Sequence, residues 1–339
     1  SPQVVGSKTQ IRRVQPPLGI ACISAVLLKK GYKNIKIIDA AVEGYDQVTA
    51  LEPNSDFIKF GLSDNEVSNK LDDFDPDIIG ISALFSSQAG CALSLAKTLK
   101  NRFPKSIIVF GGIHASKQFK EILETSPFVD FIIHGEGDLV FPEFVRRIEH
   151  NENISDCPGL IFKLSGEEKK IRKNPNNELM DMNKLPMPAW HLMDMELYYE
   201  IGMPHNPFKK HRNFMCIMTS RGCPEKCYFC SSAEYFGYGF RALSAENTLK
   251  MIEYGFKNFG AKEFQIEDDT FTLNYVRVMK ICDAIKHLGL RITLPNAIRA
   301  DYPKQHSKRL KMFKAMKEAG FEQVSMSVEH GDQEFLDKT

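Results

Sequence analysis

The sequence predicts an α/β protein of two domains, in which a doubly wound, Rossmann-like parallel sheet is followed by part of a (β/α) barrel. The chain has 339 residues and 43% hydrophobic content, which is enough for about two packed cores. Strand-like and helical patterns alternate in two separate stretches, and such alternation is typical of parallel sheets. A proline-containing stretch without clear periodicity lies between them. The predicted boundaries are residues 1–150, 151–212 and 213–339.

The first stretch, residues 1–150, alternates short β-rich runs with helical patterns. The predicted strands are Ile35–Asp39, Asp77–Leu84, Ser106–Gly111 and Phe128–His134. The predicted helices are Leu18–Lys30, Ser87–Phe103 and Lys117–Glu124. Right-handed crossovers between such strands give a parallel sheet that binds ligands at the carboxyl ends of its strands. Small residues fall at or near those ends, namely Gly80, Ser82, Gly111, Gly112, Gly135 and Gly137.

The middle stretch, residues 151–212, is predicted to connect the two domains. It contains several prolines and little periodicity, as linkers between domains often do. Leu160–Leu164 and Lys170–Arg172 flank a polar turn and predict a β-hairpin. Leu185–Asp194 is predicted to be an extended segment that leads into a short helix.

The third stretch, residues 213–339, contains a second βα series. The predicted strands are Phe214–Thr219, Glu263–Glu267, Arg291–Asn296 and Gln323–Val328. The predicted helices are Ala245–Phe259, Tyr275–Leu288 and Lys304–Ala319. Such a series is the first part of a barrel, whose active site lies at the carboxyl ends of its strands. The chain begins with Ser1 and stops inside a helical pattern, Gln333–Lys338, so we expect a barrel truncated at the C-terminus.

The composition argues against several kinds of partner. A formal net charge of +1 does not favour a bulk electrostatic partner such as nucleic acid or an anionic membrane. No apolar run approaches the roughly 18 residues needed for a membrane span, and no export signal is present. We therefore expect a location in the reducing cytoplasm. Most of the five scattered cysteines are expected to be buried free thiols; these are Cys22, Cys91, Cys157, Cys216 and Cys282.

Three further cysteines cluster in the segment RGCPEKCYFC, residues 221–230, with the spacing C-x3-C-x2-C. In a chain without an export signal, such a cluster indicates metal or redox chemistry rather than disulfides. The thiolates of Cys223, Cys227 and Cys230 can bind three corners of a cubane iron–sulfur cluster and leave the fourth iron open. A zinc knuckle is the alternative, but zinc sites commonly use two CxxC-type pairs and no second pair follows.

This motif, with the aromatic Phe229 before its last cysteine, resembles the radical S-adenosylmethionine (SAM) superfamily. The resemblance implies a [4Fe–4S] cluster on Cys223, Cys227 and Cys230, whose open iron chelates the amino and carboxylate groups of SAM. It also implies reductive cleavage of SAM to a 5′-deoxyadenosyl radical. The cysteine loop follows the first predicted strand of the barrel, as it does in that family.

Further stretches extend the resemblance to the remainder of a SAM site, to which Phe229 is also assigned. IEDDT, residues 266–270, stands where the family has its GGE motif for the SAM amino group, but it presents Glu267, Asp268 and Asp269 instead. Carboxylates can accept hydrogen bonds from an ammonium, although a solvated acidic turn is the alternative. Glu329, in SVEHGDQEFLDK, would bind the ribose or the methionyl end of SAM. Arg299 is the candidate partner of the SAM carboxylate, with a surface arginine as the alternative.

Nearly the whole chain resembles the cobalamin-dependent radical SAM enzymes, in which a cobalamin-binding domain precedes the radical SAM domain. The matching stretches are PPLGI, GISALFSS, GGIHAS and HGEGD, at residues 16–20, 80–87, 111–116 and 134–138. The resemblance implies a deep slot of small residues for the tail of cobalamin. The candidate cobalamin-binding residues are Ser82, Leu84, Ser86, Gly111, Gly112, His114, Gly135, Glu136 and Gly137.

Two absences qualify this interpretation of the first domain. A flavodoxin-like or nucleotide-binding domain is the alternative, but no complete GxGxxG follows a predicted strand. Many cobalamin domains supply a lower axial histidine from a DxHxxG loop, whereas residues 1–20 contain no histidine and His114 follows a later strand. We therefore expect a cobalt ion without a protein histidine below it.

The resemblance implies a radical methyltransferase that acts on an unactivated carbon or phosphorus centre of a small molecule. An external electron donor such as flavodoxin or ferredoxin is expected. The alternatives are a radical cyclase or oxidase, such as the anaerobic magnesium-protoporphyrin monomethyl ester cyclase, a methylthiotransferase, or a truncated, non-catalytic cobalamin-binding module. His191, Tyr198, Tyr199, His205 and the aromatic segment Tyr235–Phe240 are expected to pack rather than to act.

Overall fold

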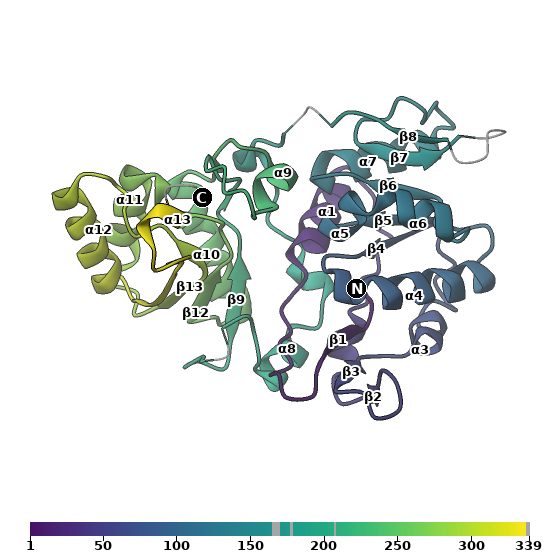
Figure 1. Ribbon diagram of the computed structural model, residues 1–339, viewed down its shortest axis with the longest axis horizontal. Coiled ribbons are helices and arrows are strands. Elements are labelled where there is room, and N and C mark those ends of the chain that lie inside the picture. The colour runs from purple at the N-terminus through teal and green to yellow at the C-terminus, as the bar shows by residue number, and fades with distance from the viewer. Residues whose placement is uncertain (165–169, 177–178, 207, 337–339) are drawn as a thin grey trace. The chain divides into compact units, whose positions relative to one another are not determined.

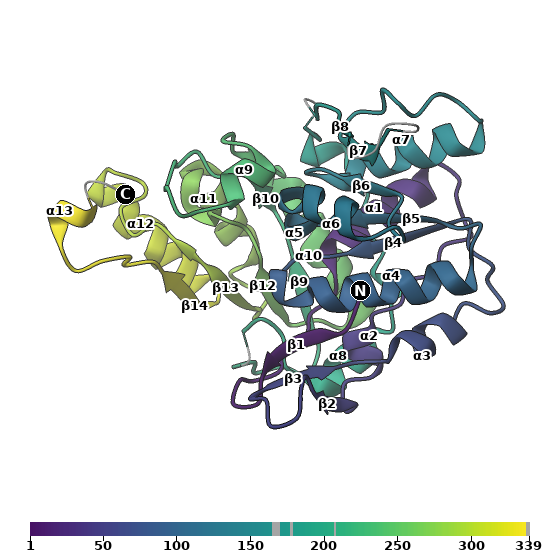
Figure 2. The same cartoon turned by 45° about the vertical axis from the view of Figure 1, so that its right-hand side comes forward.

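The computed structural model describes residues 1–164, 170–176, 179–206 and 208–336. The chain forms two compact units, and each has its own sheet (Figures 1 and 2). The first unit comprises Ser1–Met180 and Pro188–Leu197, and the second comprises Asp181–Met187 and Tyr198–Thr339. No helix in the described part of the chain has both the length and the apolar character needed to cross a membrane.

The main sheet of the first unit has five strands in the order β4-β5-β6-β7-β8. Its strands are β4 (Ile78–Ser82), β5 (Ile107–Gly111), β6 (Phe131–Ile133), β7 (Leu160–Lys163) and β8 (Ile171–Lys173). The first three strands are parallel, whereas β7 and β8 add an antiparallel hairpin beside β6. The hairpin expected within the connector therefore continues the sheet, and the chain up to Met180 belongs to the first unit.

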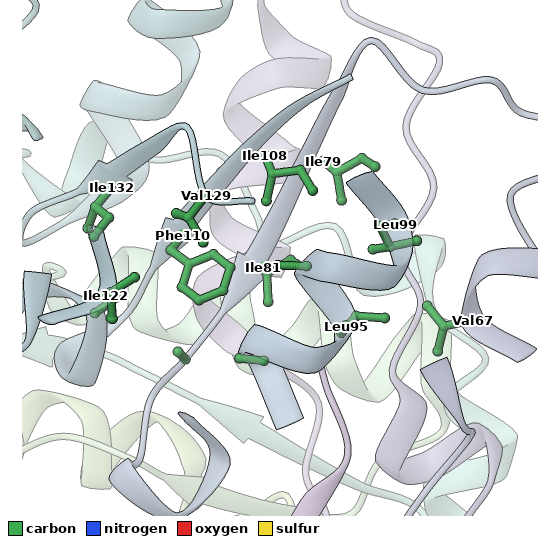
Figure 3. Packing of buried hydrophobic residues seen from close by; sticks show 14 of the residues in the cluster. Val67, Ile79, Ile81, Leu95, Leu99, Ile108, Phe110, Ile122, Val129 and Ile132 are labelled. Carbon is green, nitrogen blue, oxygen red and sulfur yellow. The ribbon is translucent and has the colours of Figure 1, made fainter. Parts of the chain in front are cut away.

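Helices of the first unit cover both faces of this sheet, because neighbouring residues of a strand point to opposite faces. Ile108 and Phe110 pack on one face against a cluster that includes Leu95 and Leu99 of α4 (Figure 3). Val109, between them in sequence, packs in a second cluster with Phe144 of α7. The helices of this unit are α1 (Leu18–Lys29), α2 (Ala40–Glu43), α3 (Asp64–Asn69), α4 (Ala89–Arg102), α5 (Ile113–Lys117), α6 (Phe119–Thr125) and α7 (Gly137–Glu149).

The prediction of a strand at Ile35–Asp39 is wrong. This segment pairs in no sheet, and the structure shows contacts between its end and the start of the chain. The amino group of Ser1 donates to Ile38 O at 2.8 Å, and Ala40 N donates to Ser1 O at 3.1 Å. A small antiparallel sheet that the sequence analysis did not predict is formed instead by β1 (Val4–Ser7), β3 (Phe57–Phe60) and β2 (Val48–Ala50).

The second unit contains an open parallel sheet in the order β14-β13-β12-β9. Its strands are β9 (Phe214–Ile217), β12 (Glu263–Ile266), β13 (Arg291–Ile298) and β14 (Phe321–Met326). The helices between them are α9 (Ser232–Phe236), α10 (Ala245–Phe259), α11 (Tyr275–Ile285) and α12 (His306–Glu318). This series confirms the predicted βα succession, and the sheet does not close into a barrel within the described residues. The predicted C-terminal helix is present as α13 (Gln333–Leu336), and the rest of that prediction lies outside the described residues.

The two faces of this sheet differ in polarity. Phe264 of β12 faces α10, since a Cβ on Gly255 of that helix would lie 2.8 Å from its ring. Glu263 and Gln265 point to the opposite face and are fully buried. A segment that precedes β9 satisfies their polar atoms. Asn206 N donates to Gln265 Oε1 at 2.9 Å, and Lys210 N donates to Glu263 Oε2 at 2.8 Å.

Candidate active site

The cysteine loop, residues 222–240, is closed at its base by two short strands. β10 (Ser220–Arg221) enters the loop and pairs antiparallel with β11 (Arg241–Ala242), which leaves it. Gly222 has φ +81°, and a Cβ there would lie 2.1 Å from Gly239 O. Only glycine fits this position, because any other side chain would collide with the returning backbone. The two ends of the loop therefore lie side by side in the two-stranded sheet of β10 and β11.

The carboxylate of Asp268 holds the strand that enters the loop. It lies directly beyond β12 and is almost fully buried. Oδ1 accepts a hydrogen bond from Thr219 N at 2.5 Å, and Oδ2 accepts from Thr219 Oγ1 and Ser220 Oγ, both at 2.6 Å. Burial raises the pKa of Asp268, while the charge of Arg277 and these hydrogen bonds act in the opposite direction. The structure therefore directs Asp268 toward the base of the loop.

Arg277 of α11 ties both ends of the loop from the other side. Its buried guanidinium donates from Nε to Leu243 O at 2.7 Å, just beyond the end of β11. Nη2 donates to Thr219 Oγ1 at 2.5 Å and to Thr219 O at 3.1 Å. Thr219 thus links Arg277 to Asp268. A buried ion pair bridged in this way is costly to break, because either charge alone would be left uncompensated.

The three clustered cysteines stand on this loop with their thiols at least partly accessible. Cys223 and Cys227 are half-buried and Cys230 is exposed, whereas Cys22, Cys157, Cys216 and Cys282 are buried as expected. Cys230 N donates to Cys227 O at 3.1 Å, which forms a turn between these two residues. Burial raises the pKa of the Cys223 thiol.

Three cysteines on one short loop form the donor set that a cubane iron–sulfur cluster uses. Among the described residues, no three His, Cys, Asp or Glu side chains converge as they do around one metal ion. In a cubane, each thiolate binds a different iron, so its three ligands stand farther apart than the ligands of one ion.

Arg299 lies next to the cysteine loop, just beyond β13. Its Nε and Nη2 donate to the two carboxylate oxygens of Asp301 at 2.9 and 2.8 Å. Its Nη1 lies 2.7 Å from Oε2 of Glu225, between the first two clustered cysteines. The hydrogen bonds to Asp301 raise the pKa of Arg299, and the same contact lowers the pKa of Asp301. Tyr302 adds a ring beneath the guanidinium, whose carbon lies 5.2 Å from the ring centre.

Glu267 and Asp269 flank Asp268 but have different surroundings. Glu267 is buried, and its Oε2 lies 2.8 Å from Nδ1 of His205, which the sequence analysis expected only to pack. The other oxygen, Oε1, is buried without a hydrogen-bond partner among the described residues. Burial raises the pKa of Asp269, and the charge of Asp268 adds to this effect. A ligand that brings hydrogen-bond donors to this corner would satisfy Glu267 Oε1.

The structure does not bring every predicted SAM-binding residue into one cluster. Phe229 lies exposed on the cysteine loop, where its ring meets that of Tyr228 edge-on at 5.4 Å. Glu329 lies exposed beyond β14, with φ +58°. Tyr198 and Tyr199 are buried, as expected of packing residues.

The candidate cobalamin-binding residues all follow the three parallel strands of the first unit. Ser82, Leu84 and Ser86 end or follow β4, Gly111, Gly112 and His114 end or follow β5, and Gly135, Glu136 and Gly137 follow β6. Since β4, β5 and β6 are parallel, these three groups of residues share the carboxyl edge of one sheet.

This edge has the features that a large planar cofactor requires. Gly112 has φ +102°, and a Cβ there would lie 2.5 Å from Ala83 O, so the two loops approach each other closely. A Cβ on Gly111 would meet nothing within 4 Å. Leu84 and Phe85 remain exposed beside them, and Ser86 Oγ lies 3.1 Å from His114 Nδ1. A low backbone ledge with apolar and hydrogen-bonding neighbours suits a corrin ring with polar side groups.

Gly137 and Glu136 serve a second purpose in the first unit. A Cβ on Gly137 would lie 2.7 Å from Cδ1 of Ile23, so this glycine lets α1 approach the start of α7. Glu136 is buried at the same helix start. The packing of α1 against the start of α7 therefore accounts in part for where Glu136 and Gly137 lie relative to the carboxyl edge of the sheet.

Sequence reasoning missed several residues of the site. Glu225 lies inside the cysteine motif, so its position on the loop could be predicted. Its ion pair with Arg299 could not, because the two residues are far apart in sequence. Arg277 and Thr219 carried no local signal, because one lies in an ordinary helical pattern and the other at a strand end. His205 was considered, and only the contact with Glu267 distinguishes it from a packing residue.

Comparison with known families matches two models to the chain. The B12 binding domain matches residues 8–145, and the Radical SAM superfamily matches residues 217–339. The second match covers the cysteine loop and the open parallel sheet, and the first covers the three parallel strands with their carboxyl edge.

Two curated relatives align over almost the entire chain. Cytidylyl-2-hydroxyethylphosphonate methyltransferase from Streptomyces wedmorensis is 27% identical over 99% of this chain. The uncharacterized methyltransferase PH0819 from Pyrococcus horikoshii is 31% identical over 95% of it. The chain spans 65% of the length of the first relative and 62% of the second.

A solved structure shows the same fold. The cobalamin-dependent S-adenosylmethionine radical enzyme OxsB, with aqua-cobalamin and S-adenosylmethionine bound, superimposes with a TM-score of 0.78 at 21% identity. The alignment covers 97% of this chain and 43% of OxsB.

Proposed function

Because the chain belongs to the cobalamin-dependent radical SAM family, with a B12-binding domain before a radical SAM domain, we propose that it is a radical methyltransferase. Its substrate would be a small molecule with an unactivated carbon or phosphorus centre. The observation that carries the proposal is the cysteine loop, which is anchored at the carboxyl end of an open parallel sheet. The names of the two relatives described above favour methyl transfer. Cyclisation is the alternative, since relatives named anaerobic magnesium-protoporphyrin IX monomethyl ester cyclase also align over 84–95% of the chain at 24–26% identity.

Within this proposal, the second unit binds the cluster and SAM. Cys223, Cys227 and Cys230 hold a [4Fe–4S] cluster, and the fourth iron is left to the amino and carboxylate groups of SAM. When bound, the cluster with SAM and cobalamin supply one-electron cleavage of SAM and a methyl donor. Asp268 and Arg277 keep the loop in place, since they hold its entry and exit.

The remaining candidates take roles that suit their surroundings. Glu267 Oε1 and Asp269 accept hydrogen bonds from the SAM ammonium, because one oxygen of Glu267 is buried and unsatisfied. Arg299 binds the SAM carboxylate beside the loop, Phe229 contacts SAM from the loop, and Glu329 binds the ribose or methionyl end. An external one-electron donor such as flavodoxin or ferredoxin reduces the cluster.

The first unit holds cobalamin at the carboxyl edge of its parallel strands. The candidate residues are Ser82, Leu84, Ser86, Gly111, Gly112, His114, Gly135, Glu136 and Gly137. We propose a cobalt without a histidine ligand, because no DxHxxG loop is present in the sequence. Nitrogen superhyperfine splitting from a protein histidine in the Co(II) electron paramagnetic resonance spectrum would contradict this assignment.

Anaerobic reconstitution with iron, sulfide and hydroxocobalamin tests the proposal. We expect about four irons per chain and corrinoid absorption bands after desalting. Cys227→Ala should lose most of the iron but keep the corrinoid, whereas Cys91→Ser in α4 should keep both. About eight irons would indicate a methylthiotransferase. Iron without cobalt would remove cobalamin from the proposal, and a folded protein that retains neither would overturn it.

Incubation of the reconstituted protein with SAM carrying a labelled methyl group and candidate acceptors then tests the reaction. We expect label in the product together with 5′-deoxyadenosine. Formation of 5′-deoxyadenosine with a cyclised or oxidised product that carries no label would identify a cyclase or oxidase.

A further inference from the structure

The contacts of Arg299 divide its donors into two groups. Nε and Nη2 bind both oxygens of Asp301, two residues further along the chain. This bidentate contact fixes the plane of the guanidinium, since its donors form a rigid fork. Nη1 points instead to the cysteine loop, where its partner is Oε2 of Glu225 at 2.7 Å.

Glu225 is held against this corner by Tyr302 as well. Its Oε1 accepts a hydrogen bond from Tyr302 Oη at 3.4 Å, and the Tyr302 ring lies beneath the Arg299 guanidinium. Arg299 is about two-fifths exposed and Glu225 a little more than a quarter, so another anion can reach the pair. A carboxylate of the cysteine loop thus contacts Nη1, the guanidinium nitrogen of Arg299 that Asp301 does not engage.

We propose that Glu225 occupies the SAM-carboxylate subsite of Arg299 and that SAM binds by displacing it. This inference rests on the proposed function, since it takes SAM as the ligand of the loop. Both groups are carboxylates, so the incoming α-carboxylate can replace the hydrogen bond that Glu225 gives up. Asp301 keeps the guanidinium in place during the exchange. No covalent bond changes.

The exchange has an energetic consequence for SAM affinity. A ligand that must displace an internal competitor binds more weakly, in proportion to the fraction of protein in which the competitor is released. A partly exposed ion pair is worth little, so the expected penalty is about two- to fivefold in the dissociation constant. Glu225 therefore tunes SAM affinity and, lying midway between Cys223 and Cys227, couples SAM arrival to the conformation of the cysteine loop.

Equilibrium dialysis of labelled SAM against the anaerobically reconstituted protein tests the exchange, with iron per chain measured for every variant. Glu225→Gln should strengthen SAM binding about two- to fivefold at unchanged iron content. Arg299→Gln should weaken it, and in the double variant the gain from Glu225→Gln should disappear. Glu253→Gln, which removes a partner of Lys257 on the exposed face of α10, is the matched control and should leave SAM affinity unchanged.

Three results would overturn the inference while leaving the proposed function intact. These are weaker or unchanged SAM binding by Glu225→Gln, a gain that persists without Arg299, and loss of iron from Glu225→Gln. The last result would show that Glu225 only shapes the loop. If the unsubstituted protein retained no iron or SAM, the proposed function itself would fail and the exchange with it.

Discussion

At the scale of single residues, Asp268 shows how one buried carboxylate organises the site. Its oxygens accept three hydrogen bonds from Thr219 and Ser220. Asp268→Asn should lower the free energy of unfolding by about 2–3 kcal/mol, because hydrogen bonds to a charged group are lost and Arg277 remains buried. Urea unfolding measures this change. Asp283→Asn, at an exposed pair with Lys286, is the control and should change stability by less than about 0.5 kcal/mol.

The same variant also separates anchoring from ligand binding. If Asp268 anchors the loop, Asp268→Asn should retain less iron on reconstitution even at temperatures where it is fully folded. Full iron content with weakened SAM binding would instead assign Asp268 to SAM, as the sequence resemblance suggests.

Residue-scale predictions from the sequence were strongest where the signal is local. The spacing of Cys223, Cys227 and Cys230 places three thiols on one loop whatever the rest of the fold does. The hydrogen bond between Thr219 and Asp268 joins residues separated by 49 positions, and no local sequence pattern predicts it. The roles assigned to Glu267, Asp269, Arg299 and the cobalamin-edge residues stay predictions until ligands are measured.

At the scale of elements, the carboxyl edge of β4 and β5 offers a matched pair of glycines. Gly112→Ala should destabilise the protein by about 1–3 kcal/mol, because it has φ +102° and its Cβ would lie 2.5 Å from Ala83 O. Gly111→Ala should fold normally, since its Cβ meets no atom within 4 Å. Thermal unfolding with corrinoid titration distinguishes them. Unimpaired corrinoid binding by Gly111→Ala would argue against this ledge as the cobalamin site.

The C-terminal half of α7 should make stability depend on pH. Glu143 receives hydrogen bonds from Arg146 and Arg147, which lower its pKa from 4.5 to about 2. A depressed pKa stabilises the folded state above pH 4.5, and this stabilisation is lost as pH falls from about 4.5 toward 2. The pair is partly exposed, so about 1 kcal/mol is expected.

Unfolding of the natural chain and Glu143→Gln in urea, followed from pH 6 to pH 2, measures this contribution. The difference between the two proteins should be largest near pH 6 and vanish near pH 2. A difference that does not depend on pH would show that Glu143 acts by packing rather than by charge.

Element boundaries were predictable where amphipathic periodicity is unbroken, as in Ala245–Phe259, whose predicted bounds equal those of α10. α7 escaped prediction because it starts at Gly137 and contains Pro142, and both residues usually mark helix ends. Ile35–Asp39 has the composition of a strand but pairs in no sheet, and Ile38 O accepts a hydrogen bond from the Ser1 amino group. A short window of sequence shows neither that a helix continues across Gly137 and Pro142 nor that Ile38 contacts Ser1.

At the scale of the whole molecule, the chain contains two compact units with separate cores. A ligand that binds the folded state suppresses local opening near its site. Hydrogen–deuterium exchange should therefore show hydroxocobalamin protecting amides at the carboxyl ends of β4, β5 and β6. SAM, added to the cluster-loaded protein, should protect the cysteine loop and the residues after β12 and β13. No protection of the amides at the carboxyl ends of β4, β5 and β6 by hydroxocobalamin would contradict the cobalamin site proposed there.

The antiparallel pairing of β10 with β11 at the base of the cysteine loop affects how this protein can change over evolutionary time. Both ends of the cysteine loop are tied at one point, by a two-residue ladder and by the close approach of Gly222 to Gly239. Insertions and substitutions between these ends leave the strands beneath them undisturbed. The segment between Cys230 and Gly239 can therefore diverge rapidly, or be exchanged by recombination, while Cys223, Cys227 and Cys230 keep their place.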